Sequence, residues 1–153
     1  MTISRLSIAF VQLRCYCHAT EDRNKVETAL STILGKVWEG IKPVTWQLHE
    51  GYYGNTIESL NLRLGKKSDI ADLLQDLFAR MQKEDKHEIE KSLTQRLDED
   101  NNLHLRLDKQ AAFRGDIRIG SEDTIRLQIK FSIPRKQREK TLESAIALLY
   151  GNM

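Results

Sequence analysis

The clearest structural pattern of this 153-residue chain lies in residues 101–131, which read NNLHLRLDKQAAFRGDIRIGSEDTIRLQIKF. Leucine alternates with polar residues over 103–107, and apolar residues alternate with polar ones over 124–131. A period of two is typical of strands that have one buried and one exposed face. The pattern therefore predicts two half-buried strands, with a third short strand at 117–119 between them.

The outward-facing positions of these strands are mostly basic. His104, Arg106, Arg126 and Lys130 alternate with the apolar residues, and Arg118 lies at the centre of the third predicted strand. One face of an antiparallel sheet commonly stays in contact with water while the other packs on the core. Because arginine and lysine donate strong hydrogen bonds to phosphate, this open face is predicted to bind a polyanion.

The residues before this region predict another long strand at 5–17. Its apolar positions change parity after Phe10, which indicates either a bulge or a strand that crosses from one packing neighbour to another. Beyond that point Arg14 and Tyr16 share the face opposite the apolar residues. Further alternation and helical spacing predict the remaining elements, with Thr20 and Ser68 as the N-caps of the first two helices. The other expected strands lie at 44–50 and 60–64, and the expected helices lie at 20–34, 68–81, 86–97 and 134–149.

These elements predict an α+β fold in a single domain, residues 1–153, built as a two-layer, mostly antiparallel sheet with helices on one face. The sequence contains no run of 18 apolar residues, so no membrane partner is expected. Cys15 and Cys17 lie two residues apart on a predicted strand, where they point the same way and cannot pair. Unpaired buried thiols are typical of a reducing compartment, and we expect a cytoplasmic protein.

Charge is unevenly distributed along the chain. The net charge is only +2, with an isoelectric point near 8.5. Residues 66–103 carry seven Lys and Arg against ten Asp and Glu, whereas residues 104–140 carry ten against five. The basic later region points to a polyanionic partner, although a merely solvated charged surface would give the same pattern.

Three more groups of residues are candidates for phosphate contact. Residues 108–114 predict a single helical turn, capped by Asp108, that tucks Ala112 or Phe113 inward and leaves Lys109, Gln110 and Arg114 outside. The last predicted helix begins with four cations, which oppose the positive end of its dipole and would be relieved by a bound anion. These four are Arg135, Lys136, Arg138 and Lys140.

The third group lies near two predicted turns. Tyr52 and Tyr53 lie between two glycines, where they either stack on unpaired bases or pack on the sheet. His18 precedes a helix N-terminus, which can hold a phosphate, but Glu21 and Asp22 already complement that dipole. The open face of the sheet is expected to lack aromatic residues, which argues against stacking of a single strand across the sheet.

The sequence contains no recognised catalytic motif. It has no glycine-rich phosphate loop, no nucleophile elbow and no pair of histidines at metal-binding spacing. We expect no enzyme, no metal and no other cofactor. The best enzymatic alternative is a nuclease in which His18 or His104 acts as a general base beside Asp108.

Three segments together resemble a known family: CHATEDRNKVETAL at 17–30, HEGYYGN at 49–55 and LRLDKQAAFRGDIRI at 105–119. In this order and chain length they are similar to a family of small archaeal RNA-binding proteins, first catalogued as a domain of unknown function and predicted to associate with the exosome. The motif positions are His18, Thr20, Glu21, Gly51, Tyr53, Gly54, Asn55, Asp108, Lys109, Gln110 and Ala111.

This resemblance implies a fold like that of the ribosomal protein that binds the smallest large-subunit RNA. It implies RNA, structured or of ribosomal type, as the partner, with no preference for DNA, and exosome or ribosome components as further partners. It adds no catalytic residues. The alternative is a protein-interaction subunit of an RNA-processing complex that does not touch RNA itself.

Overall fold

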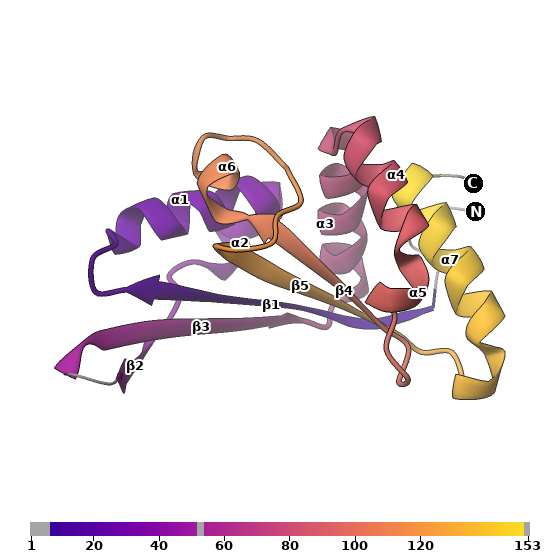
Figure 1. Cartoon of the computed structure of the whole chain (residues 1–153), viewed down its shortest axis with the longest axis horizontal. Coiled ribbons are helices and arrows are strands. Elements are labelled where there is room, and N and C mark those ends of the chain that lie inside the picture. Colours follow the sequence, from indigo (N-terminus) through magenta and orange to yellow (C-terminus); the bar gives the residue numbers. More distant parts are fainter. Residues whose placement is uncertain (1–6, 52–53, 152–153) are drawn as a thin grey trace.

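The computed structural model describes residues 7–51 and 54–151 and contains a five-stranded antiparallel sheet with helices packed on one of its faces (Figure 1). The strand order is β2-β3-β1-β5-β4, so the N-terminal strand lies at the centre. The predicted two-layer α+β architecture is confirmed. The strands are β1 Ile8–His18, β2 Gln47–Glu50, β3 Thr56–Leu64, β4 Asn102–Asp108 and β5 Thr124–Phe131.

The helices form two groups above the sheet (Figure 1). One group, with α1 and α6, covers one end, and the other, with α3, α4 and α7, covers the opposite end. Within the described ranges, no helix is long and apolar enough to cross a membrane. The helices are α1 Arg23–Leu34, η2 Gly35–Val37, α2 Trp38–Ile41, α3 Lys67–Arg80, α4 Lys83–Lys91, α5 Leu93–Arg96, α6 Lys109–Phe113, η4 Arg135–Gln137 and α7 Arg138–Tyr150.

Alternation of side chains divides the sheet into a core face and an open face. In β4 and β5 the paired residues Leu105 and Leu127 are buried against the helices, and their strand neighbours Arg106 and Arg126 face away from the core. In β1 the register with β5 shifts between Ile8 and Phe10, close to the predicted change of parity, as a bulge or a similar irregularity. The helices leave the second face of the sheet uncovered (Figure 1).

Several local predictions are wrong at element boundaries. Residues 117–119 form only an isolated bridge, Leu107 to Ile119, and not a strand. The helix predicted at 86–97 is divided into α4 and α5, whose boundary lies at Ser92.

The N-caps predicted for the first two helices, Thr20 and Ser68, are also wrong. Asp22, not Thr20, caps α1 by accepting a hydrogen bond from the Asn24 amide at 2.9 Å. The preceding residues form a turn, in which the Glu21 amide donates to the His18 carbonyl. Helix α3 begins one residue before Ser68, without a side-chain cap.

Candidate nucleic-acid interface

The open face of the sheet is strongly basic. Among the strand residues that the structure describes, this face carries five cations and a single carboxylate, Asp108. That carboxylate accepts a hydrogen bond from the Ala111 amide at 2.9 Å and caps α6, as predicted. The five cations are Arg14, Arg63, Arg106, Arg126 and Lys130.

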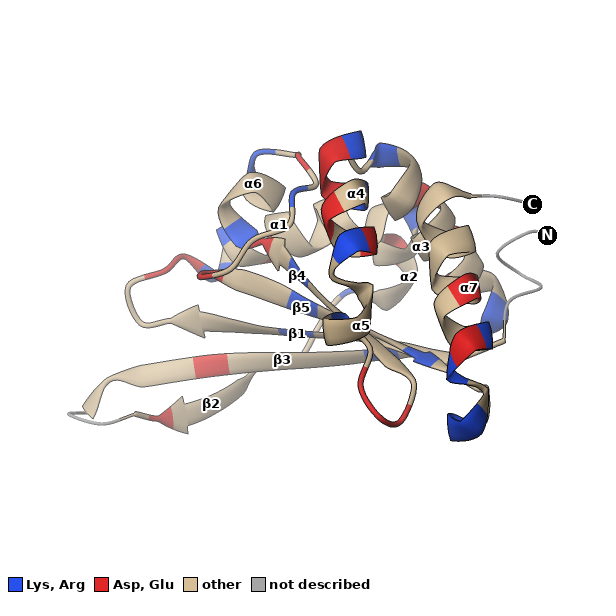
Figure 2. Ribbon diagram, turned by 45° about the vertical axis from the view of Figure 1, so that its right-hand side comes forward, with Lys and Arg blue, Asp and Glu red and all other residues tan. Residues whose placement is uncertain are grey.

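Three of these cations form a row across neighbouring strands. Arg14 of β1 is paired with Arg126 of β5, and Arg126 is paired with Arg106 of β4. Residues that are directly opposite in an antiparallel sheet have Cβ atoms about 4.5–5.5 Å apart. Blue bands mark β1, β5 and β4 at neighbouring positions in Figure 2. We call Arg14, Arg126 and Arg106 the arginine row.

The members of the arginine row lack compensating charge. All three residues are exposed, and within the described part of the chain none of their side chains makes a hydrogen bond or ion pair. Like charges directly opposite in a sheet destabilise it, so the row is unfavourable in the free protein. Sequence reasoning missed Arg14, because its place beside Arg126 depends on the register between two strands more than 100 positions apart.

A fourth cation, Arg63 of β3, lies beside the row and is held in place by contacts with its neighbours. The Arg63 guanidinium stacks over the Phe10 ring, 4.1 Å from its centroid, and donates to Gln12 Oε1 at 3.2 Å. Gln12 is buried and also donates to the Asn61 side chain. These contacts hold Arg63 on the open face, because a stacked and hydrogen-bonded guanidinium has few alternative rotamers.

The open face also carries an aromatic residue, which corrects the expectation that stacking has no platform there. Tyr16 of β1 is 51% exposed and lies two residues beyond Arg14 on the same face. Tyr52 and Tyr53, the tyrosines proposed for stacking, lie outside the described residues.

Some of the cations near the start of α7 have partners within the protein. The Arg135 guanidinium pairs with the Asp100 carboxylate, and the Lys130 ammonium donates to the Asp100 carbonyl. The red loop that contains this aspartate approaches the blue start of the helix in Figure 2. The Asp100 carboxylate thus relieves part of this charge, and binding of an external anion here stays a prediction. Lys136 is exposed and without a partner in the described ranges, and its role stays a prediction.

Arg138 has a structural role of a different kind. Its guanidinium donates to the carbonyls of Asp98, Thr94 and Leu97 at 3.0–3.1 Å. Thr94 lies in α5, and Leu97 and Asp98 follow its end, where the backbone leaves acceptors without intrahelical partners. Arg138 thus joins α7 to α5 through three of the five N–H donors of its guanidinium group.

Arg118 is likewise engaged inside the protein. Its Nε donates to Asp85 Oδ2 at 2.9 Å, and the same carboxylate accepts from the Ile119 amide at 3.1 Å. The hydrogen bond and the nearby charge of Asp85 raise the pKa of Arg118. Asp85 is buried on α4. Arg118 therefore anchors the 117–119 segment to α4 and is not a member of the arginine row.

Lys109 is buried, which corrects the prediction that it points outward. Its side chain is only 3% exposed. The ammonium donates to the Tyr16 carbonyl at 2.9 Å and forms ion pairs with Glu21 at 3.1 Å and Asp123 at 2.9 Å. We call these interactions the lysine clasp. Although burial opposes the charged form, the hydrogen bonds to Asp123 and Glu21 hold the pKa of Lys109 above its ordinary value.

The lysine clasp joins family motif residues that are distant in the sequence. Glu21 precedes α1, whereas Lys109 opens α6, and the two short helices pack together. His18, Glu21 and Asp123 have potential metal-ligand atoms within 4.8 Å of one another. The Lys109 ammonium already neutralises both carboxylates, so we assign no metal to this cluster.

The remaining predicted contact residues do not join the arginine row. Gln110 is exposed and donates to Asp123 Oδ2 at 3.2 Å. Arg114 is exposed at the end of α6, which lies on the helix-covered side of the sheet (Figure 1). His18 is exposed at the end of β1. Contact of these residues with RNA stays a prediction.

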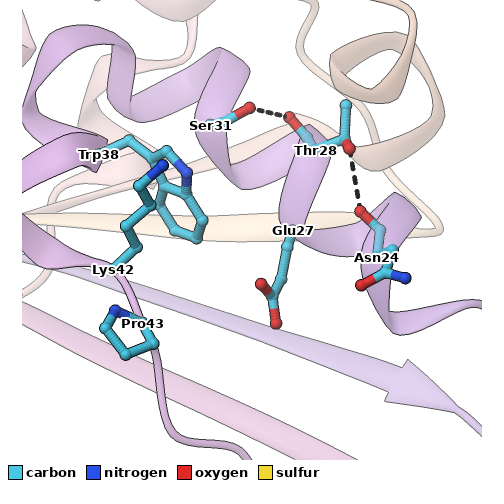
Figure 3. Close-up of a pocket in the computed structure, with 7 residues that line it drawn as sticks. All are labelled: Asn24, Glu27, Thr28, Ser31, Trp38, Lys42 and Pro43. Carbon is cyan, nitrogen blue, oxygen red and sulfur yellow. Dashed lines mark hydrogen bonds between the residues drawn. The ribbon is translucent and has the colours of Figure 1, made fainter.

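A pocket of about 570 Å³ lies on the helical layer, between α1 and the connector that ends at Pro43 (Figure 3). Its lining combines the Trp38 ring with one carboxylate, Glu27, and one ammonium, Lys42. Glu27 already accepts a hydrogen bond from the Trp46 indole at 2.9 Å. The pocket has no net excess of positive charge and is not part of the open face.

Comparison with known proteins identifies the family. A family model described as RNA binding matches residues 10–131, and the chain belongs to this family. The chain is 29% identical over 146 residues to "RNA-binding protein PAB1135" of Pyrococcus abyssi, a match that covers 92% of this chain and 93% of that protein. It is also 30% identical to the uncharacterized protein MJ0213 of Methanocaldococcus jannaschii, over 87% of this chain and 92% of that protein.

Solved structures show the same fold. Protein AF2318 from Archaeglobus fulgidus superposes with a TM-score of 0.78 at 32% identity, covering 92% of this chain and 99% of that one. Mth689 from Methanothermobacter thermautotrophicus gives 0.73 at 29% identity, covering 93% and 98%. The titles of both assign them to a domain family of unknown function, DUF54. The predicted membership of an archaeal RNA-binding family is confirmed.

The lysine clasp predicts a large stability effect for Lys109→Met. The variant keeps the apolar stem but leaves Glu21 and Asp123 without a counter-ion and the Tyr16 carbonyl without a donor. We expect the free energy of unfolding to fall by about 1.5–3 kcal/mol in urea titrations, the range for hydrogen bonds to charged groups. The exposed Lys136→Met is the matched control and should change it by less than about 0.5 kcal/mol. Equal effects of the two variants would contradict the clasp.

The clasp also predicts how stability depends on pH. Burial opposes ionisation of Asp123, but hydrogen bonds from Lys109 and Gln110 outweigh it and lower the pKa of this carboxyl. A folded-state pKa below the unfolded value means that the unfolded chain binds more protons in acid, so this contribution is lost as pH falls below about 4. Thermal unfolding of Asp123→Asn should therefore vary less between pH 6 and pH 3 than that of wild type. An unchanged pH profile would refute the assignment.

Proposed function

We propose that the protein binds RNA by placing backbone phosphates along the arginine row. The observation that carries this proposal is the alignment, on three adjacent strands, of three exposed arginines whose side chains have no partner among the described residues. Elsewhere on the described surface, the cations predicted to bind phosphate are often paired internally, as in Arg118, Arg135 and Arg138. Arginine without an internal partner is available for bidentate contact with phosphate.

RNA is proposed as the polyanion because of the chain's relatives. The family model is described as RNA binding, and the Pyrococcus protein carries the same description in its name. Phosphate contacts position a protein on RNA without specifying sequence. We therefore propose recognition of backbone and shape, with Arg63 and Lys130 as flanking cations.

Repulsion between the arginines of the row also supports a role in binding. An arrangement that lowers stability without a compensating contact in the free protein is expected at functional sites. Phosphates bound between the guanidinium groups would replace repulsion by attraction. Binding thus relieves the unfavourable free energy of repulsion in the free protein, which favours the bound state.

We propose an accessory, non-catalytic role in the cytoplasm, in RNA processing with the exosome or in a ribosome-related function. The two buried, unpaired cysteines fit a reducing compartment. Burial raises the pKa of Cys15 to about 12, so this thiol stays protonated and is a poor nucleophile, which supports the non-catalytic reading.

The test is a titration of fluorescent RNA against wild type and against Arg14→Gln/Arg106→Gln/Arg126→Gln at about 50 and 200 mM salt. We expect the triple variant to bind about 10-fold or more weakly at low salt. Its slope of log affinity against log salt should be smaller by about 2, since each lost contact with a single strand contributes about 0.7.

The matched control is Lys36→Gln/Lys83→Gln/Lys91→Gln, which removes three exposed cations from η2 and α4. It should retain most of the wild-type affinity. Equal losses in both variants would mean that only net charge matters and that the row is not a site. Failure of wild type to bind RNA at about 0.1 mM, near the weak limit of non-specific affinity, would overturn the proposal in favour of a protein-docking role.

A further inference from the structure

We infer that the open face binds single-stranded RNA, with one base stacked on Tyr16 while neighbouring phosphates lie on the arginine row. This inference rests on the proposed function and adds the kind of RNA and the residue that selects it. It starts from an exposed aromatic ring beside a set of unpaired guanidinium groups.

Tyr16 has the right position. It lies two residues beyond Arg14 on the same face of β1, which is about 6.6 Å along a strand. The ring is 51% exposed, and the residue opposite it on β3 is the small Ser59. Within the described chain the Tyr16 hydroxyl makes no hydrogen bond, so neither the ring nor its polar end is committed to the fold.

Tyr16 is also held rigidly at its backbone. Cys15 and Cys17, on either side, are buried in the core, and the Tyr16 carbonyl accepts the hydrogen bond from buried Lys109. A platform that is already ordered loses little conformational entropy when a base stacks on it. The lysine clasp, made by residues of the family motif, thus positions Tyr16 without touching RNA.

Two histidine rings share the open face with Tyr16. His49 of β2 bonds to Ser59 Oγ at 2.7 Å and is exposed, and His18 is exposed at the end of β1. Both histidines pair with Ile57 of β3, so they share the open face with Tyr16. Imidazole rings also stack on unpaired bases. The open face thus has a region with the rings of Tyr16, His18 and His49, on β1 and β2, and a region with the arginine row, on β1, β5 and β4.

This division favours a single strand over a duplex. In A-form RNA the bases are paired and stacked on one another, and proteins read the helix by shape and by its 2′-hydroxyls. A ring that lies on a sheet can reach only a base that is already unstacked. Stacking tolerates any base, because every base has an aromatic face, so little sequence preference is expected from Tyr16 alone.

The test compares Tyr16→Ala and Tyr16→Phe with wild type, using an oligouridine single strand and a blunt RNA duplex of known sequence. We expect wild type to prefer the single strand. Tyr16→Ala should weaken binding of the single strand by about 5- to 150-fold, the range measured for removal of a stacking ring, and leave duplex binding within about twofold. Tyr16→Phe should bind like wild type, because it keeps the ring.

Tyr150→Ala is the matched control, since Tyr150 is 38% exposed but lies on α7 and donates to Glu90. It should bind both RNAs like wild type. If Tyr16→Ala binds the single strand as well as wild type, or weakens both RNAs equally, the stacking inference is wrong. The arginine-row variant separates the two claims: loss of binding there with an unaffected Tyr16→Ala overturns the inference alone, whereas no RNA binding by wild type overturns both.

Discussion

The pairing of β1 with β5 is the constraint on which the rest of the structure depends. Leu13 pairs with Leu127 on the core face, and because side chains alternate, the next pair, Arg14 with Arg126, must lie on the open face. A slip of one residue would expose the apolar side chains and bury the arginines, so the register is strongly specified. The same register that buries the core therefore assembles the arginine row.

Internal pairing distinguishes the row from several of the other cations predicted to bind RNA. Lys109 is held by two carboxylates, Arg118 by Asp85, and Arg135 by Asp100. These pairs connect helices, turns and loops to one another and stabilise the layer above the sheet. The arginine row contributes nothing comparable to the free fold. Its cations repel one another in the free protein, which is expected of groups that bind a partner.

The sequence predicted the layers of the fold and two members of the row, because alternation with period two depends only on near neighbours. Arg106 and Arg126 were found in this way. Arg14 was not assigned to the site, since its relation to Arg126 requires the pairing of distant strands. Lys109 was misplaced for a different reason: a five-residue helix has too few positions to define a buried face, and its partners come from residues 21 and 123.

The most direct test of the central claim is a double-mutant cycle of Arg14→Gln and Arg126→Gln, with the free energy of unfolding measured by urea titration at low salt and without RNA. If the row is repulsive, each single variant is more stable than wild type. The coupling between them is then unfavourable by about 0.2–1 kcal/mol and shrinks as salt is added. Zero coupling, or a loss of stability in the single variants, would show that the arginines are not aligned against their own repulsion and would contradict the account.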